Sequence, residues 1–511
     1  MNRQISQVAL VSLVLLASLI VATTYWQTWA SAGLAAREDN EIQRVAQFTI
    51  DRGLIYTSNG TTVLATNVEQ KIGGQTLFFR TYPHHDLAAH VVGYSTQSRA
   101  RAGLERSENG YLTAANADLG TILATVGDRL KGTTIKGNSL VLTIHAGAQW
   151  LAQKLLRGTC GAAVVLNPKT GAVDAMASSP GFDPNLIEQG SGYAQIQATK
   201  SPCPPEPAAP LLNRATQGLY PPGSTFKTIT AAAALDDGVY TPTSTFYDPG
   251  YCVEYGKQVH NALDQSGPEA FGLVNLVEAY QHSINAVFCN IGQKLGAQRI
   301  LAEAKKFGFY SVPPLETPAD ASSASGLYVN GKLFDPRTPA QYSQVDPGRL
   351  AFGQDRMLTT PMQMAMVAAA IANGGVEMKP TLIQRILAPG GGVVASLHPQ
   401  VLRRATTAQT AGELRNMMVE VVQAGTGTAA QIPGVVVAGK TGTAETCACN
   451  TVYDAWFIFF APADNPTVAG AVVVENQNNG FGGAIAAPIA KQLMQAILSS
   501  TPNQNTGSLG H

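Results

Sequence analysis

The chain has 511 residues, in which 34 lysines and arginines balance 34 aspartates and glutamates. This length predicts two or more domains, and a hydrophobic share of 45% is enough for large packed cores. A neutral chain with only 13% charged residues lacks the positive charge that nucleic-acid binding needs, so we exclude that class of function.

The N-terminus carries an uncharged apolar stretch from Val8 to Trp29, preceded by Arg3. Its length matches a membrane span of about 20 residues, and aromatic residues at its end suit the outer membrane interface. We predict a cytoplasmic tip and single-pass anchor in residues 1–30, with the rest of the chain extracytoplasmic. The sequence Ala30-Ser31-Ala32 leaves a cleaved signal peptide open as the alternative.

A small non-catalytic domain is predicted for residues 31–137. Two short apolar runs between Phe48 and Ala65 flank Asn59-Gly60, a pair typical of a β-hairpin turn. Short strands and polar turns continue to about Lys136 without a long helical periodicity. This pattern predicts a small, strand-rich domain after the anchor.

A larger domain is predicted for residues 138–500, and a polar tail of residues 501–511 is predicted to be disordered. Helices are predicted in its interior: Gln149–Leu156, Thr225–Leu235, Leu273–Gln281, Ala286–Leu295, Pro361–Ala372 and Thr407–Val422. Strands are predicted towards its ends: Leu140–Ile144, Ala162–Asn167, Ala172–Ala177, Val435–Ala444, Ala455–Pro462 and Val468–Asn476. A closing helix is predicted for Ala487–Leu498. Strands at both ends with helices between them predict an α+β fold, one antiparallel sheet packed against helices.

The stretch Tyr220–Lys227, YPPGSTFK, is the first candidate for chemistry. The two prolines end any preceding helix, so Ser224 lies in the first turn of a new one, where the positive end of the helix dipole favours an alkoxide. Lys227 shares its face at i+3, and a buried lysine can act as a neutral base. The alternative is a capping serine beside a surface lysine.

Two later motifs decide between these interpretations. Ser283 and Asn285 lie between two predicted helices, where a hydroxyl can relay a proton and an amide can hold a substrate carbonyl. Lys440, Thr441, Gly442 and Thr443 continue the predicted strand that begins at Val435. There a cation and hydroxyls can bind a carboxylate, and the glycine lets a substrate backbone lie close. The series S-x-x-K, S-x-N, K-T-G is typical of serine acyltransferases that react with penicillin.

The chain also contains a second copy of two of these motifs. Lys169-Thr170-Gly171 is a K-T-G that bends a predicted hairpin before the nucleophile, and Ser107-Glu108-Asn109 is an S-x-N in the small domain. Neither has the required order, so we assign them no catalytic role.

With these motifs, the chain resembles the class B penicillin-binding proteins, membrane-anchored peptidoglycan D,D-transpeptidases, and most of all their actinobacterial members. The resemblance extends to further family motifs: Arg52-Gly53-Leu54-Ile55, Gly103-Leu104-Glu105, Ala351-Phe352-Gly353-Gln354, Ala372-Asn373-Gly374-Gly375 and Ala455-Trp456-Phe457. Asp355 departs from it, because many members have a glycine there, which leaves the geometry of this loop open.

The resemblance implies a β-lactamase-like transpeptidase fold and a role for each motif residue. Ser224, activated by Lys227, attacks the penultimate D-Ala carbonyl of a stem peptide, and Ser283 passes the proton to the leaving D-Ala. Asn285 orients the donor peptide. The terminal carboxylate, or that of a β-lactam, is received by Lys440, Thr441 and Thr443. The acyl group then passes to an amine on a neighbouring strand, without a metal or organic cofactor.

The resemblance also implies partners. Roughly 110 residues after the anchor are too few for a glycosyltransferase domain, so the polymer is expected from a SEDS-type glycan polymerase. Three other functions stay open: a D,D-carboxypeptidase, a β-lactamase and a non-catalytic penicillin sensor.

Two groups of residues could suggest a metal site. The six cysteines allow 15 full disulfide pairings, and we expect Cys447-Ala448-Cys449 to form a bridge or free thiols, because zinc-site companions are missing nearby. His84, His85 and His90 resemble a family stretch of the small domain, and adjacent histidines cannot easily share a metal. We therefore predict no metal at either place.

Overall fold

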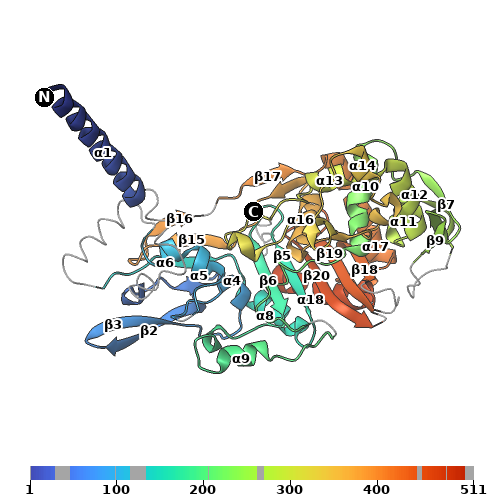
Figure 1. The fold of residues 1–511 in the computed structure, drawn as a ribbon. Coiled ribbons are helices and arrows are strands. Elements are labelled where there is room, and N and C mark those ends of the chain that lie inside the picture. The colour runs from blue at the N-terminus through green and yellow to red at the C-terminus, as the bar shows by residue number, and fades with distance from the viewer. Residues whose placement is uncertain are drawn as a thin grey trace, which may run out of the picture.

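The computed structural model (Figure 1) describes residues 2–28, 47–97, 99–115, 134–204, 207–261, 270–396, 398–445, 452–478 and 480–500. The cleavage sequence at Ala30, the pair Cys447 and Cys449, and the tail 501–511 lie outside the described residues.

The N-terminal helix α1 (Asn2–Thr28) stands apart from the rest of the chain in Figure 1. Within it, Gln7–Tyr25 has a mean hydropathy of 2.3 and none of this window is buried against other parts of the structure. Among the described residues this is the one helix long and apolar enough to cross a membrane. It fits the predicted single-pass anchor.

A five-stranded antiparallel sheet forms the centre of the larger domain. Its strand order is β18 (Ala438–Glu445), β19 (Val452–Ala461), β20 (Val468–Asn478), β5 (Gly161–Leu166) and β6 (Val173–Ser179). Alternate side chains pack into two cores, one below α8 (Ala146–Leu156) and α18 (Gly482–Ser500) and one shared with α16 (Pro361–Ala372). Sheet and helices confirm the predicted α+β fold.

Five further helices contribute to the second core, and the last of them in the chain packs against the edge strand β18. They are α10 (Lys227–Asp236), α11 (Leu276–Gln281), α12 (Asn285–Leu295), α13 (Ala297–Lys306) and α17 (Ala408–Ala424). Several predicted helix starts are wrong; α8, for example, begins at Ala146 and not at Gln149. Residues 273–275 belong to the strand β10 (Gly272–Asn275), because Asn275 caps α11 and accepts a hydrogen bond from the Glu278 amide at 2.9 Å. The closing helix begins at Gly482, five residues before the predicted start.

Smaller elements complete the larger domain. Its remaining helices are α9 (Gly192–Gln197), α14 (Pro339–Tyr342) and α15 (Pro347–Leu350). Its remaining strands are β7 (Thr245–Asp248), β8 (Tyr251–Glu254), β9 (Lys257–His260), β11 (Gly326–Val329), β12 (Lys332–Leu333), β13 (Met357–Leu358), β14 (Val376–Met378) and β17 (Val401–Arg404).

A second, six-stranded sheet links the small domain to the larger domain. Its order is β16 (Val393–Ser396), β15 (Ile383–Leu387), β4 (Ser139–Leu142), β1 (Ile55–Tyr56), β2 (Val63–Ile72) and β3 (Gln75–Thr81). Tyr56 pairs with Val63 across the turn at Asn59-Gly60, which confirms the predicted hairpin. Because β4, β15 and β16 follow residue 138, strands from both predicted domains share this sheet.

A buried ion cluster ties the small domain together beside α4 (Ala89–Val92), α5 (Gly103–Ser107) and α6 (Asn109–Leu112). Glu105 is fully buried and pairs with Arg52 at 2.7 Å and with Arg80 at 2.5 Å. Arg52 also donates to Asn109 Oδ1 at 2.7 Å. The two arginines lower the pKa of Glu105 against the effect of burial, so the carboxylate stays charged.

The cysteines and histidines have separate partners. Cys160 is bonded to Cys203 and Cys252 to Cys289. His85 Nδ1 lies 2.8 Å from Asp183, whereas His90 Nε2 lies 2.8 Å from the Pro210 carbonyl. Burial lowers the pKa of His90 to about 4, so this side chain is neutral near pH 7. The contacts with Asp183 and with the Pro210 carbonyl give His85 and His90 structural roles.

Candidate active site

Ser224 lies in a tight turn at the start of α10. The turn is a short 3₁₀ helix, Gly223–Phe226, which leads directly into the α-helix at Lys227. The predicted α-helical start at Thr225 is therefore wrong, although Ser224 does lie at the N-terminal end of the helical segment. Gly223 has φ +52°, a left-handed conformation that a glycine adopts without strain.

Two neighbouring segments hold this turn in place. The Gly223 amide donates to the Gly353 carbonyl at 3.2 Å, which places the Ala351–Gln354 motif against the turn. Trp456 Nε1 on β19 donates to the Pro221 carbonyl at 2.9 Å. Half-buried Ser224 thus sits on a loop whose backbone is fixed from two sides.

Lys227 is fully buried and points to the second motif. Its Nζ donates to the Ser283 carbonyl at 2.6 Å, to Asn285 Oδ1 at 2.7 Å and to Ser283 Oγ at 3.2 Å. The ring centroid of Phe288 lies 5.3 Å from the same nitrogen. The capping alternative required a surface lysine, and this burial contradicts it.

Ser283 lies on the loop between α11 and α12, as predicted. It adopts a left-handed conformation with φ +59°, uncommon for serine, and its amide donates to the Tyr280 carbonyl at 3.2 Å. Its Oγ accepts hydrogen bonds from Lys440 Nζ at 2.8 Å and from Lys227 Nζ at 3.2 Å. The Ser283 hydroxyl is therefore the point at which all three predicted motifs meet.

The third motif lies on the edge strand β18. Lys440 is fully buried, and its Nζ also donates to the Thr441 carbonyl at 3.1 Å. A Cβ atom at Gly442 would lie 2.9 Å from Pro222 O, Thr225 Cγ2 and Trp456 Cβ. The glycine is thus needed for the strand to pack against the nucleophile turn, a reason that differs from the predicted approach of a substrate backbone.

One hydroxyl of the site was missed in the sequence. Thr426 follows α17, and its Oγ1 lies 2.5 Å from Thr441 Oγ1. Thr443 Oγ1 accepts a hydrogen bond from the Gly482 amide at 3.3 Å. A threonine in a Gly-Thr-Gly-Thr turn has no pattern of its own, so only the fold could reveal its position beside β18.

The duplicate motifs are elsewhere. Lys169 lies in the turn between β5 and β6, the two strands farthest from β18 in the order of the sheet. Its Nζ contacts Asn465 Oδ1. Ser107 ends α5, where its Oγ donates to the Gly103 carbonyl at 3.3 Å.

The structure brings together Ser224, Lys227, Ser283, Asn285, Lys440, Thr441, Gly442 and Thr443.

Asp355 lies in a loop whose backbone conformation favours glycine. Asp355 has φ +56°, which favours glycine, and its Oδ2 accepts a hydrogen bond from the Asp346 amide at 2.9 Å. This bond holds the loop in a conformation that is unfavourable for most side chains.

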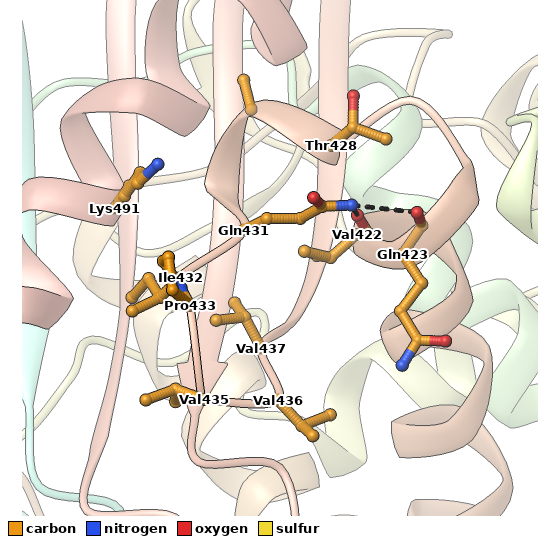
Figure 2. Close-up of a pocket in the computed structure, with 11 residues that line it drawn as sticks. Val422, Gln423, Thr428, Gln431, Ile432, Pro433, Val435, Val436, Val437 and Lys491 are labelled. Atoms are coloured by element: carbon orange, nitrogen blue, oxygen red, sulfur yellow. Dashed lines mark hydrogen bonds between the residues drawn. The ribbon is translucent and has the colours of Figure 1, made fainter.

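A cavity of about 480 Å³ lies away from these residues (Figure 2). Val422, Ile432, Val435 and Val437 form its apolar wall, and Lys491 of α18 faces them. None of the eight site residues is among the residues that line it. It is a separate surface feature.

The chain matches two protein families. The model of the penicillin binding protein transpeptidase domain covers residues 161–495, and that of the penicillin binding protein A dimerisation domain covers residues 52–140.

Individual relatives agree with these families. The chain is 34% identical to Peptidoglycan D,D-transpeptidase PbpA of Mycolicibacterium smegmatis over 98% of this chain and 99% of that protein. It is 30% identical to Peptidoglycan D,D-transpeptidase MrdA of Acinetobacter baumannii over 82% of this chain and 66% of that protein. Among solved structures it resembles penicillin-binding protein A of M. tuberculosis in a ceftriaxone acyl-enzyme complex, with a TM-score of 0.76 and 31% identity, over 89% of this chain and 100% of that one.

Proposed function

This chain belongs to the penicillin-binding protein transpeptidase family and is a peptidoglycan D,D-transpeptidase, and we propose that Ser224 is the nucleophile of its acyl-enzyme. The enzyme acts on peptidoglycan stem peptides and binds β-lactams. The observation that carries the assignment of residues is the Ser283 hydroxyl, which accepts hydrogen bonds from both Lys227 and Lys440.

Acylation begins when Ser224 Oγ attacks the carbonyl carbon of the penultimate D-Ala. Lys227, in its neutral form, takes the hydroxyl proton and passes it through Ser283 to the leaving nitrogen, so the peptide bond breaks as the ester forms. The contact of 3.2 Å between Lys227 Nζ and Ser283 Oγ supports this route, since proton relays need hydrogen-bond contact. The terminal D-Ala leaves as an amine.

Developing negative charge on the carbonyl oxygen is stabilised by backbone amides of Ser224 and Thr443. The nucleophile turn lies at the positive end of α10, and β18 packs against it at Gly442. Amides held rigidly in this way stabilise an oxyanion, and loss of one such donor costs roughly 10²–10³-fold in rate.

The substrate carboxylate binds at β18. Thr441 and Thr443 offer hydroxyls, Lys440 offers positive charge, and Thr426 adds a hydroxyl beside Thr441. Asn285 donates from Nδ2 to the His260 carbonyl at 3.3 Å and accepts from Lys227. These two bonds fix the amide beside Lys227, where it orients the donor peptide. The acyl group is then transferred to an amine of a neighbouring stem peptide.

The helix α1 serves as a single-pass anchor with the catalytic domain outside the cytoplasm. Residues 31–137 form the small non-catalytic domain of this arrangement. We further propose that a SEDS-type glycan polymerase supplies the polymer, as the resemblance to class B penicillin-binding proteins implies.

The experiment compares wild-type enzyme with Ser224→Ala, using the full chain in detergent and polymerised lipid II. We expect cross-linked stem-peptide dimers from the wild type and none from the variant. Ser107→Ala, in the duplicate S-x-N motif, is the matched control and should cross-link normally. Trimmed monomers in place of dimers would support a D,D-carboxypeptidase, and cross-linking by the Ser224 variant would refute the assigned nucleophile.

A further inference from the structure

A buried ion pair lies directly behind the nucleophile turn. Glu475 on β20 accepts two hydrogen bonds at the same oxygen, Oε1, from Tyr220 Oη at 2.6 Å and from Arg214 Nε at 2.7 Å. The exposed fractions of Glu475, Tyr220 and Arg214 are 6%, 8% and 2%. These side chains are therefore shielded from solvent.

The ion pair is fixed on both sides. The Arg214 guanidinium also donates to the Ala209 carbonyl at 3.2 Å and to the Pro207 carbonyl at 3.4 Å. The Glu475 amide donates to the Cys160 carbonyl at 2.8 Å, and Cys160 is bonded to Cys203. Glu475 Oε1 thus has a defined position, because its strand and its charged partner are both held.

Tyr220 connects this pair to the nucleophile. It is the first residue of YPPGSTFK, and its backbone exchanges two hydrogen bonds with Thr359, at 2.9 and 2.8 Å. Its ring packs edge-on against Trp456 at a centroid distance of 6.1 Å, and Trp456 in turn binds the Pro221 carbonyl. Because proline has a fixed φ, a displacement of Tyr220 is passed along the Pro221-Pro222 segment to Ser224 with little damping.

The chemistry of the tyrosine suits a permanent hydrogen bond. Burial and the Glu475 carboxylate raise the pKa of Tyr220 well above its usual value. The hydroxyl therefore stays protonated and donates to Glu475 throughout the pH range in which transpeptidases are assayed.

We propose that Glu475, held by Arg214, is a positioning residue that acts through the Tyr220 hydroxyl to fix the nucleophile turn for acylation. The inference rests on the proposed role of Ser224. In this proposal Glu475, Arg214 and Tyr220 do not contact the substrate. Their effect is on where Ser224 Oγ and its backbone amide lie when the carbonyl carbon arrives.

The test separates position from stability with two variants of the full chain. Tyr220→Phe removes only the hydroxyl. Glu475→Gln keeps an oxygen that can accept from Tyr220 but leaves the Arg214 charge unpaired, which strongly destabilises a protein. The matched control is Tyr82→Phe, because Tyr82 is also buried, at 4% exposed, and its Oη accepts from the Ser95 amide at 2.8 Å.

The measurements are the acylation rate and the noncovalent dissociation constant for a fluorescent penicillin, together with Tm. We expect Tyr220→Phe to acylate roughly tenfold more slowly, since small displacements in an active site cost that much or more, with its dissociation constant unchanged. Tyr82→Phe should lower Tm by about as much as Tyr220→Phe does, but it should acylate at the wild-type rate. Glu475→Gln should have the lower Tm of the two site variants and yet acylate faster than Tyr220→Phe.

Two results would overturn the inference: wild-type acylation by Tyr220→Phe, or acylation losses that follow the order of the Tm losses in all three variants. If Glu475→Gln does not fold, the comparison of Tyr220→Phe with Tyr82→Phe still decides. Penicillin labelling of Ser224→Ala, run in parallel, tests the proposed nucleophile by itself. Failure of the positioning role is therefore distinguishable from failure of the proposed function.

Discussion

The contact between β18 and the nucleophile turn predicts the effect of a single methyl group. In Gly442→Ala the new Cβ would lie 2.9 Å from Pro222 O, Thr225 Cγ2 and Trp456 Cβ, whereas ordinary contacts lie at 3.4–4 Å. The three atoms belong to the turn and to the neighbouring strand, so no single flexible side chain can move to make room. Strand and turn must separate by about half an ångström to restore ordinary contact.

This separation has two measurable costs. Overpacking of this kind lowers the free energy of unfolding by about 1–3 kcal/mol. It also moves the amides of Ser224 and Thr443 apart, and these are the proposed oxyanion donors. Since a misplacement of 1 Å can cost roughly 10²-fold in rate, about half that distance corresponds to roughly tenfold slower acylation.

The assay is stopped-flow acylation by a fluorescent penicillin, with Tm recorded for each protein. Gly412→Ala is the matched control, because no atom lies within 4 Å of a Cβ at this position of α17. Alanine is favoured over glycine in a helix by about 1 kcal/mol, so this control should be slightly stabilised and fully active. If folded Gly442→Ala acylated at the wild-type rate, the close packing of β18 on the turn would not matter for catalysis.

Three further substitutions test other parts of the structure. Ser283→Ala removes the hydroxyl that both buried lysine side chains bind, and acylation should fall by roughly 10²-fold or more in stopped-flow assays; a rate near wild type would remove Ser283 from the proton route. Thr426→Val removes the hydroxyl beside Thr441 and should raise the penicillin dissociation constant severalfold, about 1 kcal/mol of binding; an unchanged constant would exclude Thr426 from the carboxylate site. Glu377 is fully buried with Arg403 Nε 3.6 Å away, and burial raises its pKa from 4.5 to about 8. The folded protein keeps this proton between pH 4.5 and 8 while the unfolded chain loses it, so stability falls as pH rises through that window, by at most about 4–5 kcal/mol. Glu377→Gln should therefore gain more in Tm at pH 8 than at pH 5, and an equal gain at both would contradict the raised pKa.

The motifs and the sheet were predictable because they depend on local chemistry. The hairpin at Asn59-Gly60, the strands of the central sheet and the helix α16 each have a turn pair, an apolar run or a capping residue in the sequence. The order of the three catalytic motifs predicted which copies would meet. Ser283 joins both lysines in the structure, whereas Lys169 and Ser107 do not reach the site.

Other features depend on contacts between distant segments. The helix α18 begins at Gly482, where a Cβ atom would lie 2.2 Å from the Trp456 carbonyl oxygen and 2.3 Å from that of Gly442, so this start depends on packing against β18 and β19. Thr426 and the pair of Glu475 with Arg214 carry no local pattern and acquire their roles only through strand neighbours. The start of α11 was different, since Asn275 and Glu278 form a capping box that the sequence already contained.

The central claim is that Ser224 carries the acyl group. The direct measurement is peptide-resolved mass spectrometry of the full-length protein after reaction with penicillin. We predict one penicilloyl adduct, on the peptide that contains Ser224, and none in the Ser224→Ala variant. An adduct on a different residue, such as Ser283, would contradict the assignment of the nucleophile and the mechanism that follows from it.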